Sequence, residues 1–481
     1  MQPLVDCPLM EVDIASPFLR RCFESKYIVT FCNSGTVAAN DAFIEVELDS
    51  FLSVISTSIP SSQNGNLLTF DLGNVDVGQC GNFEIIVLIS CDAELGITHC
   101  TNAHIFPDTI CEPPPPTDWS GANLQITGNC NSTNDMVEFT ITNTGIGDMP
   151  DGTSSIVIED AVMMLNGVPV NSLGVDESQM FSYAANGSTM RMELEQVVNH
   201  PFGGSIAAVV EGCGENSTGS FSTGFVNQFP LENNNPFTAI DCQENIGAYD
   251  PNDKQAFPKG FGDQNFIEAN TDIEYLIRFQ NTGTDTAFNV VIKDTLSSFL
   301  NIGSFRLGAS SHPVDFNMEG NGVLVFSFNN IMLPDSNINE AASHGFVQFK
   351  IAQKDDLANG TILENDAAIF FDFNEPIITN TVSHTIGENF ISVNTQKIFL
   401  PNLAVHTFPN PFRDVVQFEV EGANFQLIQM NLYDLTGRLI RTTTHSENQF
   451  SFYRNQLLSG MYFYTLSGDG KIISSGKLSV K

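Results

Sequence analysis

Three segments of this chain repeat one pattern, an alternating strand that ends in Asn-[Ser/Thr]-Gly, and this repeat limits the fold to tandem β units. The segments are YIVTFCNSG at 27–35, VEFTITNTG at 137–145 and YLIRFQNTG at 275–283. In each, apolar residues lie two, four and six positions before the Asn, so one face of a strand is buried. Asn and Gly tolerate positive φ, so a turn follows. A second strand comes next in every copy (AFIEVEL, SSIVIED and FNVVIKD).

A second landmark recurs later in the copies. GNFEIIVLISC at 81–91 matches GGSIAAVVEGC at 203–213, and GFVQFKI at 345–351 holds the same place without a Cys. Helix-period patterns are nearly absent, and short alternating runs between turn signals are typical of all-β folds. We therefore predict an all-β fold of tandem β-sandwiches followed by a small C-terminal β-sandwich. The expected divisions are a Cys-rich domain at 1–112, a polyproline linker at 113–117, domains at 118–242 and 248–388, a linker at 389–404 and a last domain at 405–481.

Charge and cysteine content restrict where the protein works. Acids outnumber bases 56 to 19, a formal net charge of −37, which argues against nucleic acid and anionic membrane surfaces as partners. No run of about 18 apolar residues is present, so no membrane span is expected. Ten cysteines lie between Cys7 and Cys242 without a CxxC pair, which indicates disulfides in an oxidising compartment. The first 30 residues show no export signal, so we expect the natural protein to begin upstream of Met1.

Two disulfides are predicted from equivalent positions in two copies. Cys22 lies 11 residues before Asn33, and Cys130 lies 13 residues before Asn143. Cys91 and Cys213 each end the second landmark, so we predict the pairs Cys22–Cys91 and Cys130–Cys213. The sequence assigns no partners to the remaining cysteines, which are Cys7, Cys32, Cys80, Cys100, Cys111 and Cys242.

One dense group of potential zinc ligands lies at 91–111. Its members are Cys91, His99, Cys100, His104 and Cys111. Zinc sites usually contain closely spaced Cys pairs, which this group lacks. Disulfide bonding is therefore the favoured interpretation of its cysteines.

Four acidic residues offer oxygen ligands that suit calcium. They are Asp250, Asp253, Asp372 and Glu375. They lack the regular spacing of a calcium-binding loop, and acidic residues at strand ends more often cap turns. We expect no cofactor, with calcium as the alternative.

The sequence contains no recognisable catalytic constellation. Gly-x-Ser-x-Gly, His-Glu-x-x-His, a P-loop and Gly-x-Gly-x-x-Gly are all missing, and the eight histidines are scattered singly. One Trp and eight Tyr argue against a sugar-stacking cleft. We expect no catalytic residues.

The repeats resemble the immunoglobulin-like repeats of bacterial surface proteins, including the cell-adhesion-related domain. The stretch YLIRFQNTGTDTAFNVV at 275–291 fits that pattern best. Around it, DPNDK at 250–254, the segment 329–351 and the segment 369–386 look like a domain common in exported proteins of Bacteroidetes. The first two copies match only the general pattern.

The C-terminal segment resembles a sorting domain. After FPNPF, the chain contains VVQFEV, IQMNLYDLTGRLIRT, FSFYRNQLLSGMYFYTL and GKIISSGKLSVK. The order of signatures over 405–481 is similar to the type A C-terminal sorting domain of the type IX secretion system. The matching motif residues are Pro409, Asn410, Pro411, Asp434, Gly437, Gly460, Tyr462 and Gly476.

The two resemblances together imply a function. They imply periplasmic transit, recognition by the type IX outer-membrane translocon and its sortase, and a secreted or surface-anchored protein. A structural or adhesive role with an unknown protein or glycan ligand is the main hypothesis. The alternatives are the stalk and sorting region of an extracellular hydrolase whose catalytic domain lies upstream, and a carbohydrate-binding surface module.

Overall fold

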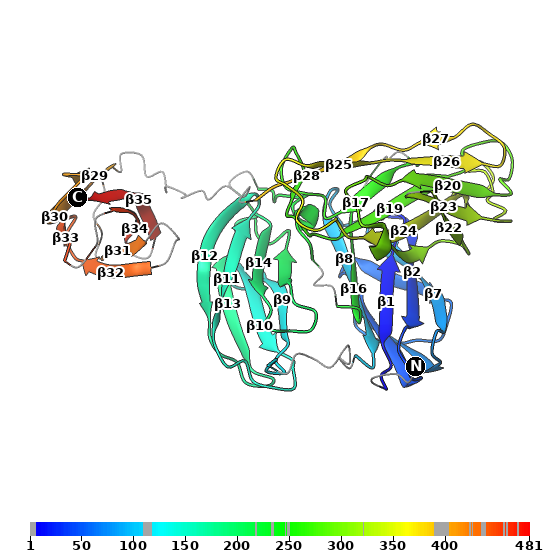
Figure 1. The fold of residues 1–481 in the computed structure, drawn as a ribbon, viewed down its shortest axis with the longest axis horizontal. Helices are drawn as coiled ribbons and strands as arrows, with labels where there is room; N and C mark the ends of the chain where they lie inside the picture. The colour runs from blue at the N-terminus through cyan, green and yellow to red at the C-terminus, as the bar shows by residue number, and fades with distance from the viewer. Residues whose placement is uncertain are drawn as a thin grey trace. The chain divides into compact units, whose positions relative to one another are not determined.

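The structure is a computed structural model and divides into two compact units, Met1–Ser392 and Val393–Lys481. Figure 1 shows its strands, and the only helices in the described ranges are three short 3-10 helices, η1 (Val226–Gln228), η2 (Ile302–Ser304) and η3 (Ala341–Ser343). The all-β prediction is therefore confirmed. The structure describes residues 6–108, 118–216, 219–231, 235–245, 247, 251–320, 322–388, 404–422, 425, 427–433, 439–455, 457, 460–468 and 471–481.

The first sandwich contains two antiparallel sheets. One sheet has the order β1-β2-β7-β4, and the other has the order β16-β8-β3-β6-β5. Alternating apolar residues from both sheets fill the space between them, including Tyr27, Phe70 and Phe83. Its strands are β1 (Met10–Ala15), β2 (Glu24–Asn33), β3 (Ala39–Glu47), β4 (Leu52–Thr57), β5 (Ser62–Asn64), β6 (Leu67–Val75), β7 (Cys80–Ile89), β8 (Thr98–Phe106) and β16 (Thr238–Glu244).

Strand β16 differs from the expected division of the chain. Residues 238–242 are expected at the end of the second domain, but β16 pairs antiparallel with β8 of the first sandwich. The second sandwich is therefore inserted between two strands of the first. The pattern of alternation predicts a strand here, but strand pairing over this sequence distance is decided in space.

The second sandwich packs a three-stranded sheet, β13-β10-β9, on a four-stranded sheet, β12-β11-β14-β15. Its core includes Val137, Phe139, Ile141 and Met192. The strands are β9 (Leu124–Asn131), β10 (Met136–Asn143), β11 (Thr153–Glu159), β12 (Val162–Val170), β13 (Ser178–Ala184), β14 (Met190–Glu195) and β15 (Ser205–Val210).

The third sandwich contains three sheets, with the orders β17-β19-β24-β21, β18-β28-β25 and β22-β23-β20-β26-β27. Its core combines aliphatic side chains with aromatic ones, among them Tyr275, Phe279, Phe326 and Phe349. The strands are β17 (Lys254–Phe257), β18 (Phe266–Ile267), β19 (Ile273–Gln280), β20 (Val290–Thr295), β21 (Arg306–Ser310), β22 (Asp315–Glu319), β23 (Val323–Phe328), β24 (His344–Ile351), β25 (Ile362–Asn365), β26 (Ala367–Phe371), β27 (Ile377–Ile378) and β28 (Val382–Ile386).

The C-terminal unit is a small sandwich with its own apolar core. Its sheets have the orders β29-β30-β33 and β32-β31-β34-β35, and Phe418, Leu432 and Leu466 lie in the core between them. The strands are β29 (Ala404–Phe408), β30 (Val415–Glu421), β31 (Ile428–Tyr433), β32 (Leu439–His445), β33 (Gln449–Tyr453), β34 (Gly460–Gly468) and β35 (Lys471–Val480).

A small apolar cluster packs the first sandwich against the third. It consists of Ala15 and Ile28 from the first and Leu276, Ala309 and Phe346 from the third. All five side chains are buried, so the two sandwiches exclude water where they meet.

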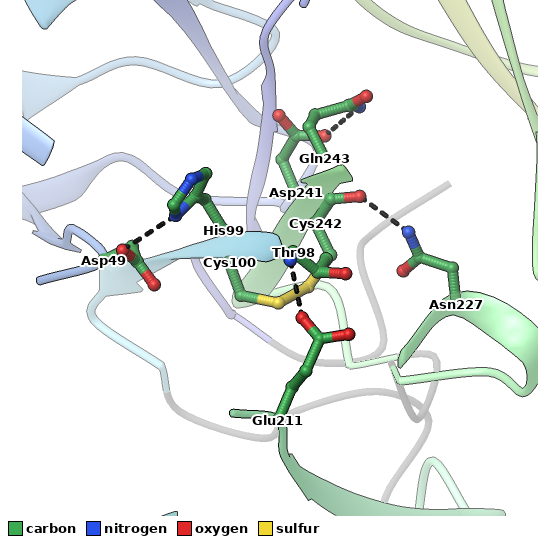
Figure 2. Close-up of a disulfide and its surroundings, with 9 residues drawn as sticks. All are labelled: Asp49, Thr98, His99, Cys100, Glu211, Asn227, Asp241, Cys242 and Gln243. Atoms are coloured by element: carbon green, nitrogen blue, oxygen red, sulfur yellow. Dashed lines mark hydrogen bonds and ion pairs between the residues drawn. A yellow bond between two sulfur atoms is a disulfide. The ribbon is translucent and has the colours of Figure 1, made fainter. Parts of the chain in front are cut away.

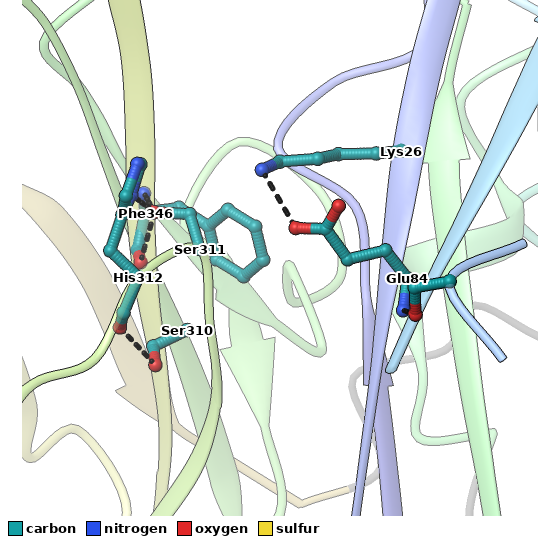
Figure 3. A network of polar contacts seen from close by, with 7 residues as sticks. Lys26, Glu84, Ser310, Ser311, His312 and Phe346 are labelled. Carbon is teal, nitrogen blue, oxygen red and sulfur yellow. Dashed lines mark hydrogen bonds and ion pairs between the residues drawn. The ribbon is translucent and has the colours of Figure 1, made fainter. Parts of the chain in front are cut away.

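Beside this cluster, the Lys26–Glu84 ion pair of the first sandwich faces His312 and Phe346 of the third (Figure 3). Burial lowers the pKa of His312 to about 4, and the nearby Lys26 charge acts in the same direction. His312 is therefore neutral at physiological pH, and its ring Nδ1 lies 2.8 Å from the hydroxyl of Ser311.

Candidate functional site

The Asn of each repeat fixes the turn that follows its strand. Asn33, Asn143 and Asn281 are all buried. In each, the side-chain oxygen accepts the backbone N–H of the Gly two residues later, at 3.0–3.1 Å. The amide nitrogen donates to the carbonyl four residues later and to a distant carbonyl, those of Val75, Leu173 and Leu333 respectively. The motif found in the sequence is thus a structural device of the three sandwiches.

Four disulfides lie in the described part of the chain. Cys22 is joined to Cys91 and Cys130 to Cys213, the two pairs that the sequence predicts. The structure adds the pairs Cys32–Cys80 and Cys100–Cys242. Cys7 is also disulfide-bonded, and Cys111 lies outside the described residues.

The Cys100–Cys242 bridge lies where the inserted second sandwich returns to the first (Figure 2). Asn227 donates its amide N–H to the carbonyl of Cys242, at 2.9 Å. Glu211 accepts the backbone N–H of Thr98, at 2.6 Å, and burial raises the pKa of Glu211 to about 7. The disulfide therefore closes the first sandwich where the insertion returns, and the Thr98–Glu211 hydrogen bond connects the first sandwich to the second.

Disulfide bonding accounts for two cysteines of the potential zinc group, Cys91 and Cys100. Cys91 and Cys100 are bonded to cysteines outside the group. His99 is fully buried and contacts Asp49 through Nδ1, at 3.0 Å, while His104 contacts Asp108, at 3.1 Å. No group of three potential metal ligands occurs among the described residues.

The calcium candidates that the structure describes, Asp253, Asp372 and Glu375, do not form a cluster of potential metal ligands. Asp253 binds the guanidinium of Arg278 through both carboxylate oxygens, at 2.6 and 2.5 Å. Asp372 accepts the backbone N–H groups of Phe288 and Asn289, and Glu375 is exposed. Asp250 lies outside the described residues.

Arg278 also links the first and third sandwiches, a role that its place in the strand pattern did not indicate. It lies on β19 and is 4% exposed. Its third nitrogen donates to the carbonyl of Pro17 in the first sandwich, at 2.8 Å. Near it, the fully buried Asp241 accepts the backbone N–H of Ser16, at 2.9 Å, and the amide of Gln243, at 2.7 Å. Burial raises the pKa of Asp241 to about 7.

A cleft of about 410 Å³ lies where the three sandwiches meet. Its lining includes Arg191 and Glu193 of the second sandwich and Glu268 of the third. Arg191 pairs with Glu193, at 2.8 Å, and donates to the carbonyl of Pro230, at 2.7 Å. Burial and the charge of Glu193 raise the pKa of Glu268. Acidic side chains outnumber basic ones in the lining of the cleft.

The core of the third sandwich contains three buried polar side chains that sequence reasoning missed. Lys254 begins β17 and forms an ion pair with Asp294 of β20, and both side chains are fully buried. Asn365, the last residue of β25, is 3% exposed. The signal in the sequence was a polar residue at an inward position of an alternating strand, at both Asp294 and Asn365.

The sorting-motif residues are divided between described and undescribed parts of the C-terminal unit. Asn410 holds β35 through two hydrogen bonds: its amide donates to the carbonyl of Lys477, at 2.6 Å, and its oxygen accepts the N–H of Ser479, at 2.9 Å. The prolines 409 and 411 flank it between β29 and β30.

Backbone bonds between Phe412 and the last two residues extend the contact with β35. Phe412 donates its N–H to Ser479, at 2.9 Å, and accepts that of Lys481, at 2.8 Å. Gly460 begins β34, Tyr462 packs on the core, and Gly476 lies opposite Tyr464 on β35. Asp434 and Gly437 lie outside the described residues. The FPNPF segment and the last strand therefore fold as one structure.

Comparison with known proteins assigns two parts of the chain. Residues 406–481 match the family described as secretion system C-terminal sorting domain. Residues 250–385 match a domain of unknown function (DUF7619). No match to a curated protein is found. No helix in the described ranges has the length and apolar character needed to cross a membrane.

Solved structures with some likeness to this chain include three surface proteins. The collagen-binding domain of a Staphylococcus aureus adhesin is 8% identical, with 30% of this chain and 100% of that chain covered and a TM-score of 0.20. BcpA, the major pilin subunit of Bacillus cereus, is 10% identical, with 75% and 95% covered and a TM-score of 0.21. The C-terminal domain of the Streptococcus pyogenes antigen I/II-family protein AspA is 9% identical, with 48% and 99% covered and a TM-score of 0.21.

The sorting-domain match and the four signatures found in the sequence agree on the same residues. The match also indicates export to the cell surface or the medium. This chain therefore ends in a C-terminal sorting domain of the type IX secretion system, preceded by a DUF7619 domain.

Proposed function

We propose that this chain is a non-catalytic structural or adhesive protein of the cell surface, delivered by its C-terminal sorting domain. The single observation that carries the proposal is the sorting domain at 406–481, attached to a body of cross-linked β-sandwiches. Disulfides brace the first and second sandwiches internally, and a buried Arg–carbonyl bond and an apolar cluster join the first sandwich to the third. Such a body is suited to a rigid stalk or display scaffold. We also propose that residues 118–242, without β16, and residues 248–388 are two separate domains of this body.

The C-terminal unit and the body of β-sandwiches have different proposed partners. The translocon and the sortase recognise the folded C-terminal unit, while a protein or glycan ligand meets the body. The C-terminal unit has its own core, and a domain with its own core folds without its cargo.

Deletion of the last strand tests the proposal. A chain with an added signal peptide is expressed in a Bacteroidetes host, with and without residues 471–481, and the cells are fractionated. We expect the full chain at the surface and the truncated chain in the periplasm, with the body still folded. Surface delivery of the truncated chain would contradict the sorting role.

The non-catalytic role has its own test. Purified protein is assayed on ester, peptide and glycoside substrates. Turnover that one point substitution abolishes would show that the body is an enzyme.

A further inference from the structure

The buried polar group in the third sandwich brings together a primary amine, a carboxyl group and a carboxamide. Lys254, Asp294 and Asn365 come from three different sheets and meet inside one core. Nζ of Lys254 contacts Oδ2 of Asp294. Burial raises the pKa of the Asp294 carboxyl and of the Tyr275 hydroxyl, and the neighbouring Asn365 amide partly opposes that rise in both. Amine and amide therefore adjoin the same carboxyl group.

Aromatic rings line the amine side of this group. Nζ of Lys254 lies 4.4 Å from the centroid of the Tyr275 ring and 5.5 Å from that of Phe349. Burial lowers the pKa of the Lys254 amine and raises that of the Asp294 carboxyl. A proton shared by the pair thus moves readily to the carboxyl group, which leaves a neutral, nucleophilic amine.

The amide of Asn365 is the least satisfied member. Neither its nitrogen nor its oxygen has a hydrogen-bond partner of standard geometry, and Oδ1 of Asp294 has none either. Buried polar atoms without partners are rare in native proteins and need an explanation. A buried ion pair beside an unsatisfied amide adds little to stability, because burial removes water from the charges and the amide. Groups that react with each other, in contrast, must be held close together.

We propose that Lys254 and Asn365 form an intramolecular isopeptide bond and that Asp294 is the catalytic acid–base residue. The neutral amine attacks Cγ of Asn365, while protonated Asp294 polarises the amide oxygen. The Nζ–Cγ bond forms and the Cγ–Nδ2 bond breaks. Asp294 carries one amine proton to Nδ2, which leaves as ammonia. No oxidant or co-reactant is consumed, and a neutral amide replaces the charged amine.

The distribution of cysteines supports a covalent link at this place. The first and second sandwiches each contain internal disulfides, but no cysteine follows Cys242 in the sequence. Lys254 lies at the first strand of the third sandwich and Asn365 near its end. A covalent bond between them would transmit a pulling force directly from the first strand of this sandwich to its end. The strands between them would then not be unfolded by the force, a property that suits a surface stalk.

Peptide mapping of the full chain tests the proposal. In the purified, denatured and reduced protein, we expect a branched tryptic peptide that joins the Lys254 and Asn365 segments, and no cleavage after Lys254. The intact mass should fall by one ammonia, about 17 Da. The branched peptide separates this bond from succinimide formation at another Asn, which gives the same mass change without joining two segments.

Three variants and one control identify the reacting groups. Lys254→Met, Asn365→Ala and Asp294→Asn should all lack the branched peptide, and their Tm should fall by the order of 10 °C. Lys293→Met, which removes a neighbouring exposed lysine of β20, should keep the bond. Separate, unlinked Lys254 and Asn365 peptides from folded wild-type protein would overturn the proposal, and this result does not depend on whether any variant folds.

Discussion

Cys100 on β8 and Cys242 on β16 lie directly opposite each other in one antiparallel ladder and form a disulfide, although 142 residues separate them. The whole second sandwich lies between these two cysteines in sequence. The bridge therefore fastens both ends of an inserted domain to the sheet from which it departs.

Removing this bridge should loosen β16 selectively. Closing a loop of this length contributes about 3–5 kcal/mol in the chain-entropy model, so the double substitution Cys100→Ser/Cys242→Ser should lower the free energy of unfolding by about that amount. Hydrogen exchange should show faster exchange at 238–244. The matched control, Cys130→Ser/Cys213→Ser, should instead affect β9 and β10 of the second sandwich. Unchanged protection of β16 would contradict the assigned role.

The disulfide pairing should be directly visible by peptide mapping. Under non-reducing conditions we expect the four linked pairs Cys22–Cys91, Cys32–Cys80, Cys100–Cys242 and Cys130–Cys213, in addition to the linkage of Cys7. Reduction before digestion is the control and should release every pair. Recovery of Cys22 linked to any cysteine other than Cys91 would refute the predicted scheme.

The buried Asn of the repeats should be essential for stability. Asn281→Ala would leave the N–H of Gly283 and the carbonyls of Asp285 and Leu333 without this partner. We expect a loss of about 2–4 kcal/mol in urea unfolding, because buried polar groups would lose their bonds. Thr282→Ala, at the exposed neighbouring position, should change stability by less than about 0.5 kcal/mol. Equal effects of the two substitutions would contradict the structural role of the Asn.

Stability should fall as the pH rises, because a buried acid has a raised pKa in the folded protein. Burial raises the pKa of Asp241 to about 7, whereas an unfolded Asp has a value of about 4. Between these values the folded state holds a proton that the unfolded state has lost, so the stabilising contribution of Asp241 is fully present below about pH 4 and is lost as the pH rises to about 7.

The measurement compares the wild type with Asp241→Asn at pH 5 and pH 8. The wild type should lose about 2 kcal/mol more between these values than the variant, whose amide does not titrate. The exposed Asp92→Asn is the control and should follow the wild type. A variant with the same pH dependence as the wild type would show that Asp241 is not the titrating group.

Export should depend on the hydrogen bonds by which Asn410 of the FPNPF segment holds β35. Asn410→Ala removes both hydrogen bonds to β35, so we expect the C-terminal unit to lose about 1–3 kcal/mol of stability and the surface fraction of the protein to fall. Ser446→Ala, at an exposed position of the same unit, should be exported normally. Normal export of an Asn410 variant whose C-terminal unit is destabilised would contradict this prediction, because it would show that recognition does not depend on the stability of the unit.

The sequence by itself determined the features that depend on local periodicity. Alternation predicted the buried faces of β2, β10 and β19, and the Asn-[Ser/Thr]-Gly motif predicted the turns after them. The order of motifs after FPNPF identified the sorting domain, because those signatures are contiguous in the chain. Repeat equivalence singled out the two cysteine pairs, since corresponding residues occupy corresponding places in a shared fold.

Only the tertiary structure decided which distant segments meet. Strand β16 reads as part of the second sandwich but completes a sheet of the first. Asp253 has the chemistry of a calcium ligand but binds Arg278. Lys254, Asp294 and Asn365 are ordinary polar residues in the sequence, and they acquire a chemical meaning only when three sheets bring them into one dry core. The physical reason is that strand pairing and desolvation act through space, and neither leaves a local signature in the chain.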